Sequence, residues 1–113
     1  MLHPLDVKVG DLGSTCRRGD KWAESFGEEI ALCVCKQRQT AEYACPPSSI
    51  VGQAKVLGIW QGTFFEIPAR YLVFEHEVSS RSYGGLMQSM RKAYGKDFVD
   101  SERITVVLYR RIS

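Results

Sequence analysis

The feature of this sequence that most constrains its fold is a long β-prone run, Ala54 to Phe65 (AKVLGIWQGTFF), that two glycines interrupt. Gly58 and Gly62 divide the run, and glycine inside a strand often marks a bulge or a bend. A strand that bends in this way curls the sheet to which it belongs. We therefore expect a strongly bent sheet that rolls up into a small β-barrel.

Three other segments have strand character. Glu29 to Lys36 alternates with period two and is apolar on both faces, which predicts a central strand buried on each side. Arg103 to Arg110 (RITVVLYR) alternates cleanly and is expected to be the closing strand. Ser14 to Arg17 predicts a brief strand, which the RRGD turn at Arg17 to Asp20 would end.

Two helices are expected between the long run and the closing strand. Pro68 suits the first turn of a short helix, PARYLVF, because the N–H that proline lacks would be unpaired there. A second helix is expected from Ser82 to Tyr94, with Ser79 or Ser80 as its N-cap and Gly95 as a left-handed C-cap. The order of strands, two short helices and a last strand predicts an α+β fold, a small and strongly bent β-barrel with two short helices inserted before the last strand.

Length and composition restrict the class of protein. The chain has 113 residues, and we expect a single domain over residues 1–113. No apolar run approaches the roughly 20 residues that cross a bilayer, so no membrane partner is expected. The first residues, MLHPLDVKVGD, lack the cationic start and apolar stretch of a secretory signal, which predicts a cytoplasmic protein.

The four cysteines leave three interpretations open: structural thiols, a metal site, or one reactive thiol. Their spacing, C-x16-C-x-C-x9-C, differs from the paired C-x2-C spacing of zinc ribbons. We expect structural thiols, with no metal and no other cofactor. The cysteines are Cys16, Cys33, Cys35 and Cys45.

Charge is unevenly distributed along the chain. The net charge of +2 is too small to indicate nucleic acid by itself. Residues 79–113, however, hold seven basic residues against three acidic ones, which suits either a phosphate-bearing ligand or a solvated helix face. The sequence contains no G-x-x-x-x-G-K-[ST], G-x-G-x-x-G or H-E-x-x-H, so the common NTPase, dehydrogenase and zinc-protease classes have no support.

Two polar clusters are candidate sites. The first surrounds a tight turn and combines a hydroxyl, three cations and an indole, which suit phosphate oxygens and a stacked base; alternatively the indole only anchors the turn. It comprises Thr15, Arg17, Arg18, Lys21 and Trp22. The second is expected to be exposed and offers carboxylates for general-base work, or simply an ion pair with its arginine. It comprises Glu75, His76, Glu77 and Arg81.

Several short segments resemble the ASCH domain, a family of the PUA-like superfamily. They are F-E-I-P at 65–68, F-E-H-E at 74–77, Tyr94-Gly95 with Phe98 three residues on, the closing TVVLYR, and G-D-L-G-S-T-C-R from Gly10 to Arg17. The last lies where such domains carry Gly-x-Lys-x-x-Thr-x-Arg. The resemblance implies a β-barrel with a cleft beside the helical insertion, and binding of RNA or nucleotides.

Some ASCH domains resemble amidohydrolases that act on acetylated cytidine, and this pattern is only partly present. The family's lysine falls on Leu12 and its first threonine on Gly13, whereas Thr15 and Arg17 match. A carboxylate is present at residue 75 or 77. Leu12 has no amino group to orient a nucleophilic threonine, so the hydrolytic chemistry would need Lys21 in its place.

The sequence thus leaves three functions open. The first hypothesis is an RNA- or nucleotide-binding module; its ligand-binding residues would be Arg17, Arg18, Trp22, Glu75 and Arg81. The second is a small hydrolase acting on a modified nucleoside or on RNA, with Thr15, Lys21 and Glu77 as catalytic residues. The third is a protein-interaction domain whose partner docks on an exposed loop from Gln37 to Gly52.

Overall fold

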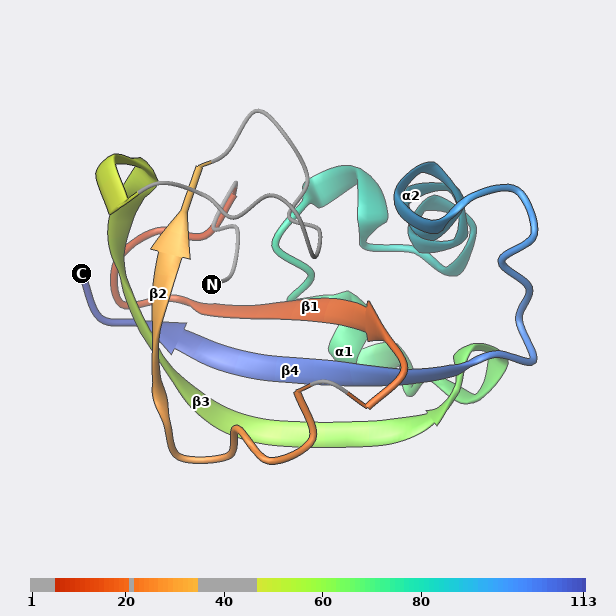
Figure 1. The fold of residues 1–113 in the computed structure, drawn as a ribbon, viewed down its shortest axis with the longest axis horizontal. Coiled ribbons are helices and arrows are strands. Elements are labelled where there is room, and N and C mark those ends of the chain that lie inside the picture. The colour runs from red at the N-terminus through yellow and green to blue at the C-terminus, as the bar shows by residue number, and fades with distance from the viewer. Residues whose placement is uncertain (1–5, 21, 35–46) are drawn as a thin grey trace.

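The computed structural model of the chain describes residues 6–20, 22–34 and 47–113. Within these residues a sheet of four strands carries two helices between its third and fourth strands in sequence (Figure 1). The strands are β1 (Leu12–Arg18), β2 (Glu29–Cys33), β3 (Ile50–Thr63) and β4 (Arg103–Arg111). The helices are α1 (Ala69–Leu72) and α2 (Tyr83–Tyr94), and the short 3-10 turns are η1 (Pro47–Ser49), η2 (Phe64–Glu66) and η3 (Val78–Ser80). This arrangement confirms the predicted α+β class.

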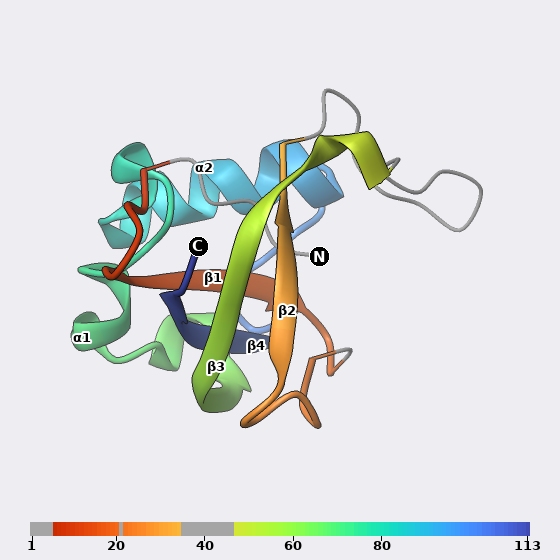
Figure 2. The same cartoon turned by 90° about the vertical axis from the view of Figure 1, so that its left-hand side faces the viewer.

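The sheet is curled into a half-barrel. Its strand order is β1-β4-β3-β2, and all neighbours are antiparallel. Figure 1 and Figure 2 show β2 running steeply across the direction of β1 and β4, with the long β3 bending from one direction to the other. The bend coincides with a register shift between Val56 and Gly58, so the bulge expected near Gly58 is confirmed. At Gly62 no register shift occurs; a Cβ there would lie 2.7 Å from the Trp60 ring, so this glycine makes room for an indole.

One predicted strand position is wrong. β2 is an edge of the described sheet and not a central strand. A register shift between Leu32 and Cys33 interrupts its alternation, and both side chains are buried, which explains its apolar character on both sides. The central position belongs to β4, where four consecutive side chains, from Ile104 to Val107, are buried. Of the expected loop, residues 37–46 lie outside the described residues, and residues 50–52 belong to β3.

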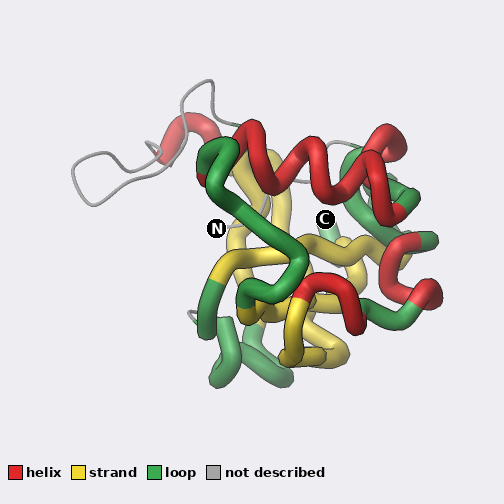
Figure 3. Tube along the Cα trace, turned by 90° about the vertical axis from the view of Figure 1, so that its right-hand side faces the viewer, coloured by secondary structure: helices red, strands yellow, loops and turns green. Residues whose placement is uncertain are grey.

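The sheet separates two apolar clusters. The first core contains Val7, Ile30, Leu32, Ala54, Val56, Val107 and Tyr109, with Trp22 and Ile59 packed against it. The second core contains Cys16, Phe64, Leu86, Met90, Phe98, Ile104 and Val106. Figure 3 shows α2 lying across the strands on one side of the molecule. The two clusters lie on opposite faces of the sheet, because side chains alternate between the faces of a strand: Ile104 and Val106 of β4 belong to the second core, and Val107 and Tyr109 belong to the first.

The ends of α2 differ from their predicted form. Its N-cap is Ser82, whose hydroxyl accepts a hydrogen bond from the Gly85 N–H at 3.0 Å. Ser79 and Ser80 instead lie in η3. Gly95 has a positive φ of 105°, but its ψ of 166° is not the expected left-handed helical value. None of the helices in the described ranges is long and apolar enough to span a bilayer.

Candidate functional site

The free edge of β1 is joined to the acidic segment that precedes η3. The Ser14 N–H donates to the Phe74 carbonyl at 2.6 Å, and the His76 N–H donates to the Ser14 carbonyl at 2.8 Å. These two hydrogen bonds form a parallel bridge between Ser14 and Glu75. Segments that are distant in the sequence are therefore adjacent, and the strand that carries Thr15 and Arg17 lies beside Glu75.

Glu75 is buried, which corrects the expectation of an exposed acidic cluster. Only 3% of the residue is exposed, because the bridge to β1 draws it into the molecule. Its Oε1 contacts the Nδ1 of His76. Arg81 binds this segment through the backbone, since its Nε donates to the Glu75 carbonyl at 2.9 Å. The Glu75 carboxylate is therefore held by His76, and the Glu75 backbone is held by Arg81.

The face of the sheet that carries Thr15 and Arg17 of β1 and Tyr109 of β4 contains two buried polar groups with no hydrogen-bond partner in the described part of the chain. They are the Arg17 Nε and the Tyr109 hydroxyl. Tyr109 has 0% exposure, and Thr15 on the neighbouring strand is buried as well. Most buried polar groups in proteins are hydrogen-bonded, so these two unpartnered donors make this part of the sheet a candidate for ligand binding.

Glu75 and Arg17 both act electrostatically on the middle of the β1–β4 pair. Burial raises the pKa of the Tyr109 hydroxyl, the charge of Glu75 raises it further, and Arg17 and Arg111 oppose this. Burial and Glu75 likewise raise the pKa of the Cys16 thiol, again against Arg17. Both charged groups therefore lie near the same residues. A thiol with a raised pKa stays protonated at neutral pH, so Cys16 acts as a structural residue.

Tyr109 was not predicted as a site residue. It lies opposite Gly13, where a Cβ would come within 2.7 Å of the Tyr109 Cζ, so the glycine provides the space for the phenol end of the ring. The sequence carries a weak signal for this position. A tyrosine in an apolar, alternating strand needs a partner for its hydroxyl, and RITVVLYR offers none.

We expect the Tyr109→Phe protein to be more stable than the wild type by about 1 kcal/mol, because the change removes a buried hydroxyl that has no partner. The gain should increase above pH 10, the ordinary tyrosine pKa being about 10. There the unfolded wild type releases a proton that the folded protein, with its raised pKa, retains, so wild-type stability falls as pH rises. Urea unfolding at pH 7.5 and above pH 10 tests this, and a less stable Tyr109→Phe variant would contradict it.

The remaining predicted residues lie apart from Glu75. Arg18 projects to the opposite face from Arg17, pairs with Glu102, and has its guanidinium 6.0 Å from the centre of the Tyr94 ring. Trp22 packs against the first core and lines a cavity of about 280 Å³ together with acidic and serine side chains, Glu24, Ser25 and Glu28. Lys21 lies outside the described residues.

Glu77 differs from Glu75 in its surroundings. It is partly exposed, precedes η3, and accepts a hydrogen bond from the Ser79 hydroxyl at 3.1 Å. The described residues include no group of three histidine, cysteine or acidic side chains that could hold a metal ion. Cys16 and Cys33 are buried, and the other two cysteines lie outside the described residues.

The curled antiparallel half-barrel with two helices inserted before its last strand is an ASCH-like fold. The structure is similar to the crystal structure of an ASCH domain from Lactobacillus crispatus JV V101, with a TM-score of 0.62 and 8% sequence identity. The similarity covers 91% of this chain but 65% of the other, and at this identity it concerns the fold alone. No protein-family model and no curated protein matches the sequence.

Proposed function

We propose that this protein binds RNA or a nucleotide and holds a base next to Arg17, Glu75 and Tyr109. The observation that carries the proposal is the pair of buried, unpartnered groups, the Arg17 Nε and the Tyr109 hydroxyl, near a buried carboxylate. The edge of a base presents donors and acceptors close together, and the bases of single-stranded RNA are recognised at such edges. The ASCH-like fold adds to the proposal through its resemblance to RNA-binding domains.

The three side chains would have different roles. Glu75 would accept a hydrogen bond from an amino group, while Arg17 and Tyr109 would donate to ring nitrogens or carbonyl oxygens. Hydrogen bonds between buried groups are stronger than those in water, so a few of them suffice for selectivity. Because Glu75 and Tyr109 are buried, the protein would have to open at this point before a base, itself unstacked from its neighbours, could reach them.

Hydrolysis receives less support from this set of residues. Leu12, at the position of the family's lysine, lines a cavity whose cations are Arg81 and Arg110. Arginine remains protonated in proteins and cannot take a proton from a threonine hydroxyl. The described residues that line this cavity therefore include no amine that could replace the family's lysine, and binding needs no such base.

Nucleosides and a short single-stranded RNA, titrated while amide NMR signals are followed, test the proposal. We expect Arg17→Gln and Glu75→Gln each to weaken binding by about tenfold or more, since each loses a charge-assisted hydrogen bond. Arg17→Lys should weaken it too, because lysine keeps the charge but not the planar fork. If a variant also removes a contact to a phosphate of single-stranded RNA, the slope of the logarithm of the binding constant against the logarithm of the salt concentration should become smaller by about 0.7.

Lys55→Gln is the matched control, because Lys55 is exposed on β3 and its loss changes the net charge equally. Equal affinities for the Lys55→Gln and Arg17→Gln proteins would disprove the proposed site. Incubation with acetylated cytidine separates the alternative function. Release of acetate that is lost in Thr15→Val would show a hydrolase in place of a binding module.

A further inference from the structure

A second cavity lies at the beginning of β1, between that strand and the chain that follows α1. It is a shallow cavity that is open to the surface, with a volume of about 420 Å³. It is lined by Gly10, Asp11, Leu12, Val73, Phe74, Arg81 and Arg110. Leu12 and Thr15 are three residues apart in an extended strand, so their side chains project to opposite faces. This cavity is therefore separate from the site around Arg17 and Tyr109.

Two arginines of the cavity are held in place through backbone carbonyls. The Arg81 Nε donates to the Glu75 carbonyl at 2.9 Å, and the Arg110 Nη1 donates to the Gly10 carbonyl at 2.7 Å. Each guanidinium has five N–H donors, and its other nitrogens make no hydrogen bond to the residues that the structure describes. A guanidinium fixed at one nitrogen has less conformational entropy to lose when its remaining donors bind an anion.

The other residues of the cavity determine its net charge and give it an apolar wall. Asp11 contributes one negative charge against two positive charges, and none of the ion pairs among the described residues involves these three side chains. The Phe74 ring is half-buried, and Val73 is exposed, so one wall of the cavity is apolar. The cavity thus offers a net positive charge, a set of planar donor forks and an apolar wall.

We infer that this cavity binds a phosphate group, held between Arg81 and Arg110. The planar guanidinium matches phosphate oxygens in pairs, and two of them around one cavity suit a tetrahedral dianion better than a single lysine would. The phosphate could belong to a free phosphorylated compound or to a nucleic-acid backbone, and both sources present the same oxygens. The cavity lies on the other face of β1 from the base site and takes a different ligand group, but the two sites share one contact, because Arg81 also donates to the Glu75 carbonyl.

Titration with inorganic pyrophosphate, followed by NMR, tests the inference. We expect shifts of the amide signals of Gly10, Asp11 and Leu12 and of the Arg81 and Arg110 Nε–H signals. Arg81→Gln and Arg110→Gln should each weaken pyrophosphate binding by about tenfold or more, since a charge-assisted hydrogen bond is lost. Asp11→Asn should strengthen it roughly fivefold, because one repulsive charge is removed from the cavity.

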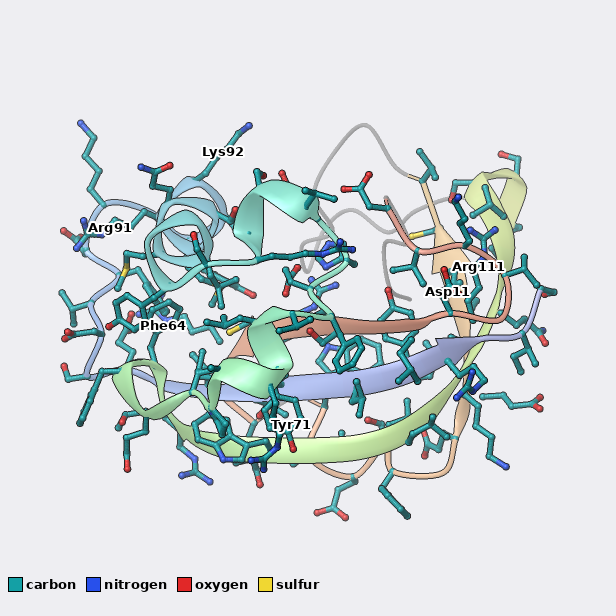
Figure 4. The ribbon with its side chains drawn as sticks, turned by 180° about the vertical axis from the view of Figure 1, so that it is seen from behind. Asp11, Phe64, Tyr71, Arg91, Lys92 and Arg111 are labelled. Atoms are coloured by element: carbon teal, nitrogen blue, oxygen red, sulfur yellow. The ribbon has the colours of Figure 1, made fainter. Side chains whose placement is uncertain are left out.

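Lys92→Gln is the control of equal charge, and Figure 4 shows Lys92 on α2 far from Asp11. If a short RNA competes with pyrophosphate, the ligand is a phosphate of a nucleic-acid backbone. If pyrophosphate binds and the RNA does not compete, the ligand is a free phosphorylated compound. The inference fails if Arg81→Gln and Arg110→Gln, folded as judged by their urea midpoints, bind as well as Lys92→Gln, or if Asp11→Asn weakens binding. Nucleosides without phosphate report the base site separately. Arg110→Gln distinguishes the two sites, because Arg110 donates to the Gly10 carbonyl and not to the Glu75 segment.

Discussion

Phe64→Ala should lower the free energy of unfolding by about 3–5 kcal/mol, the largest effect that we expect from one side chain of this protein. Phe64 has 0% exposure and lies in the second core. Its ring meets those of Tyr83 and Phe98 edge to face, with centroids 5.0 Å and 5.5 Å away. Figure 4 shows it at the end of the sheet below α2. Its removal would leave a cavity among aromatic rings that cannot close fully, and urea unfolding measures the loss.

The neighbouring residue is the control. Phe65 is 59% exposed, and Phe65→Ala should change the free energy of unfolding by no more than about 0.5 kcal/mol. Both variants remove the same side chain from the same 3-10 turn, η2, so the turn's own preferences cancel in the comparison. Losses of similar size in the two variants would show that the second core is not organised around Phe64.

This pair also marks the limit of what the sequence predicts about the fold. The β-prone run from Ala54 to Phe65 correctly predicts a long strand, and Gly58 its bulge. The strand ends at Thr63, however, and η2 begins at Phe64, so period two no longer applies to the two phenylalanines. Strand order is not encoded in local patterns either. β4 is central because β1 and β3 both pair with it, and this depends on the tertiary structure.

The candidate site was predictable only in part for a similar reason. Sequence patterns single out Thr15, Arg17 and Glu75 as polar residues on a strand and in an acidic segment. These patterns do not distinguish Glu75 from Glu77. In the structure the bridge to Ser14 buries Glu75, whereas Glu77 is partly exposed. That bridge joins residues 61 positions apart, and no periodicity in the sequence indicates it. Glu75 becomes a neighbour of β1 only through this bridge in the tertiary structure.

Gly85→Ala should lower the free energy of unfolding by about 3 kcal/mol, at the upper end of the cost of overpacking. A Cβ on Gly85 would lie 2.0 Å from the backbone oxygen of Ser79, in η3. Backbone atoms cannot rotate away as a side chain can, so η3 must move off the beginning of α2. The 2.5 Å contact between the Ser80 and Ser89 hydroxyls would then be lost.

Gly84→Ala should have the opposite sign and is the control. A Cβ on Gly84 meets nothing within 4 Å, and neither glycine has a positive φ. Alanine at this helical position restricts the unfolded chain and should stabilise the protein by about 0.5–1 kcal/mol. Urea unfolding of the two variants measures both effects, and a stable Gly85→Ala protein would show that η3 is not tightly packed against α2.

The same change should weaken ligand binding, because η3 continues directly from the segment that carries Glu75. Arg81, the residue after η3, donates to the Glu75 carbonyl, so a displacement of the turn moves the backbone that positions this carboxylate. We therefore expect Gly85→Ala to lose affinity for nucleosides at temperatures where it is still folded, and Gly84→Ala to keep it. Normal nucleoside affinity in a folded but destabilised Gly85→Ala protein would show that Glu75 is positioned by its bridge to β1 alone, without support from η3.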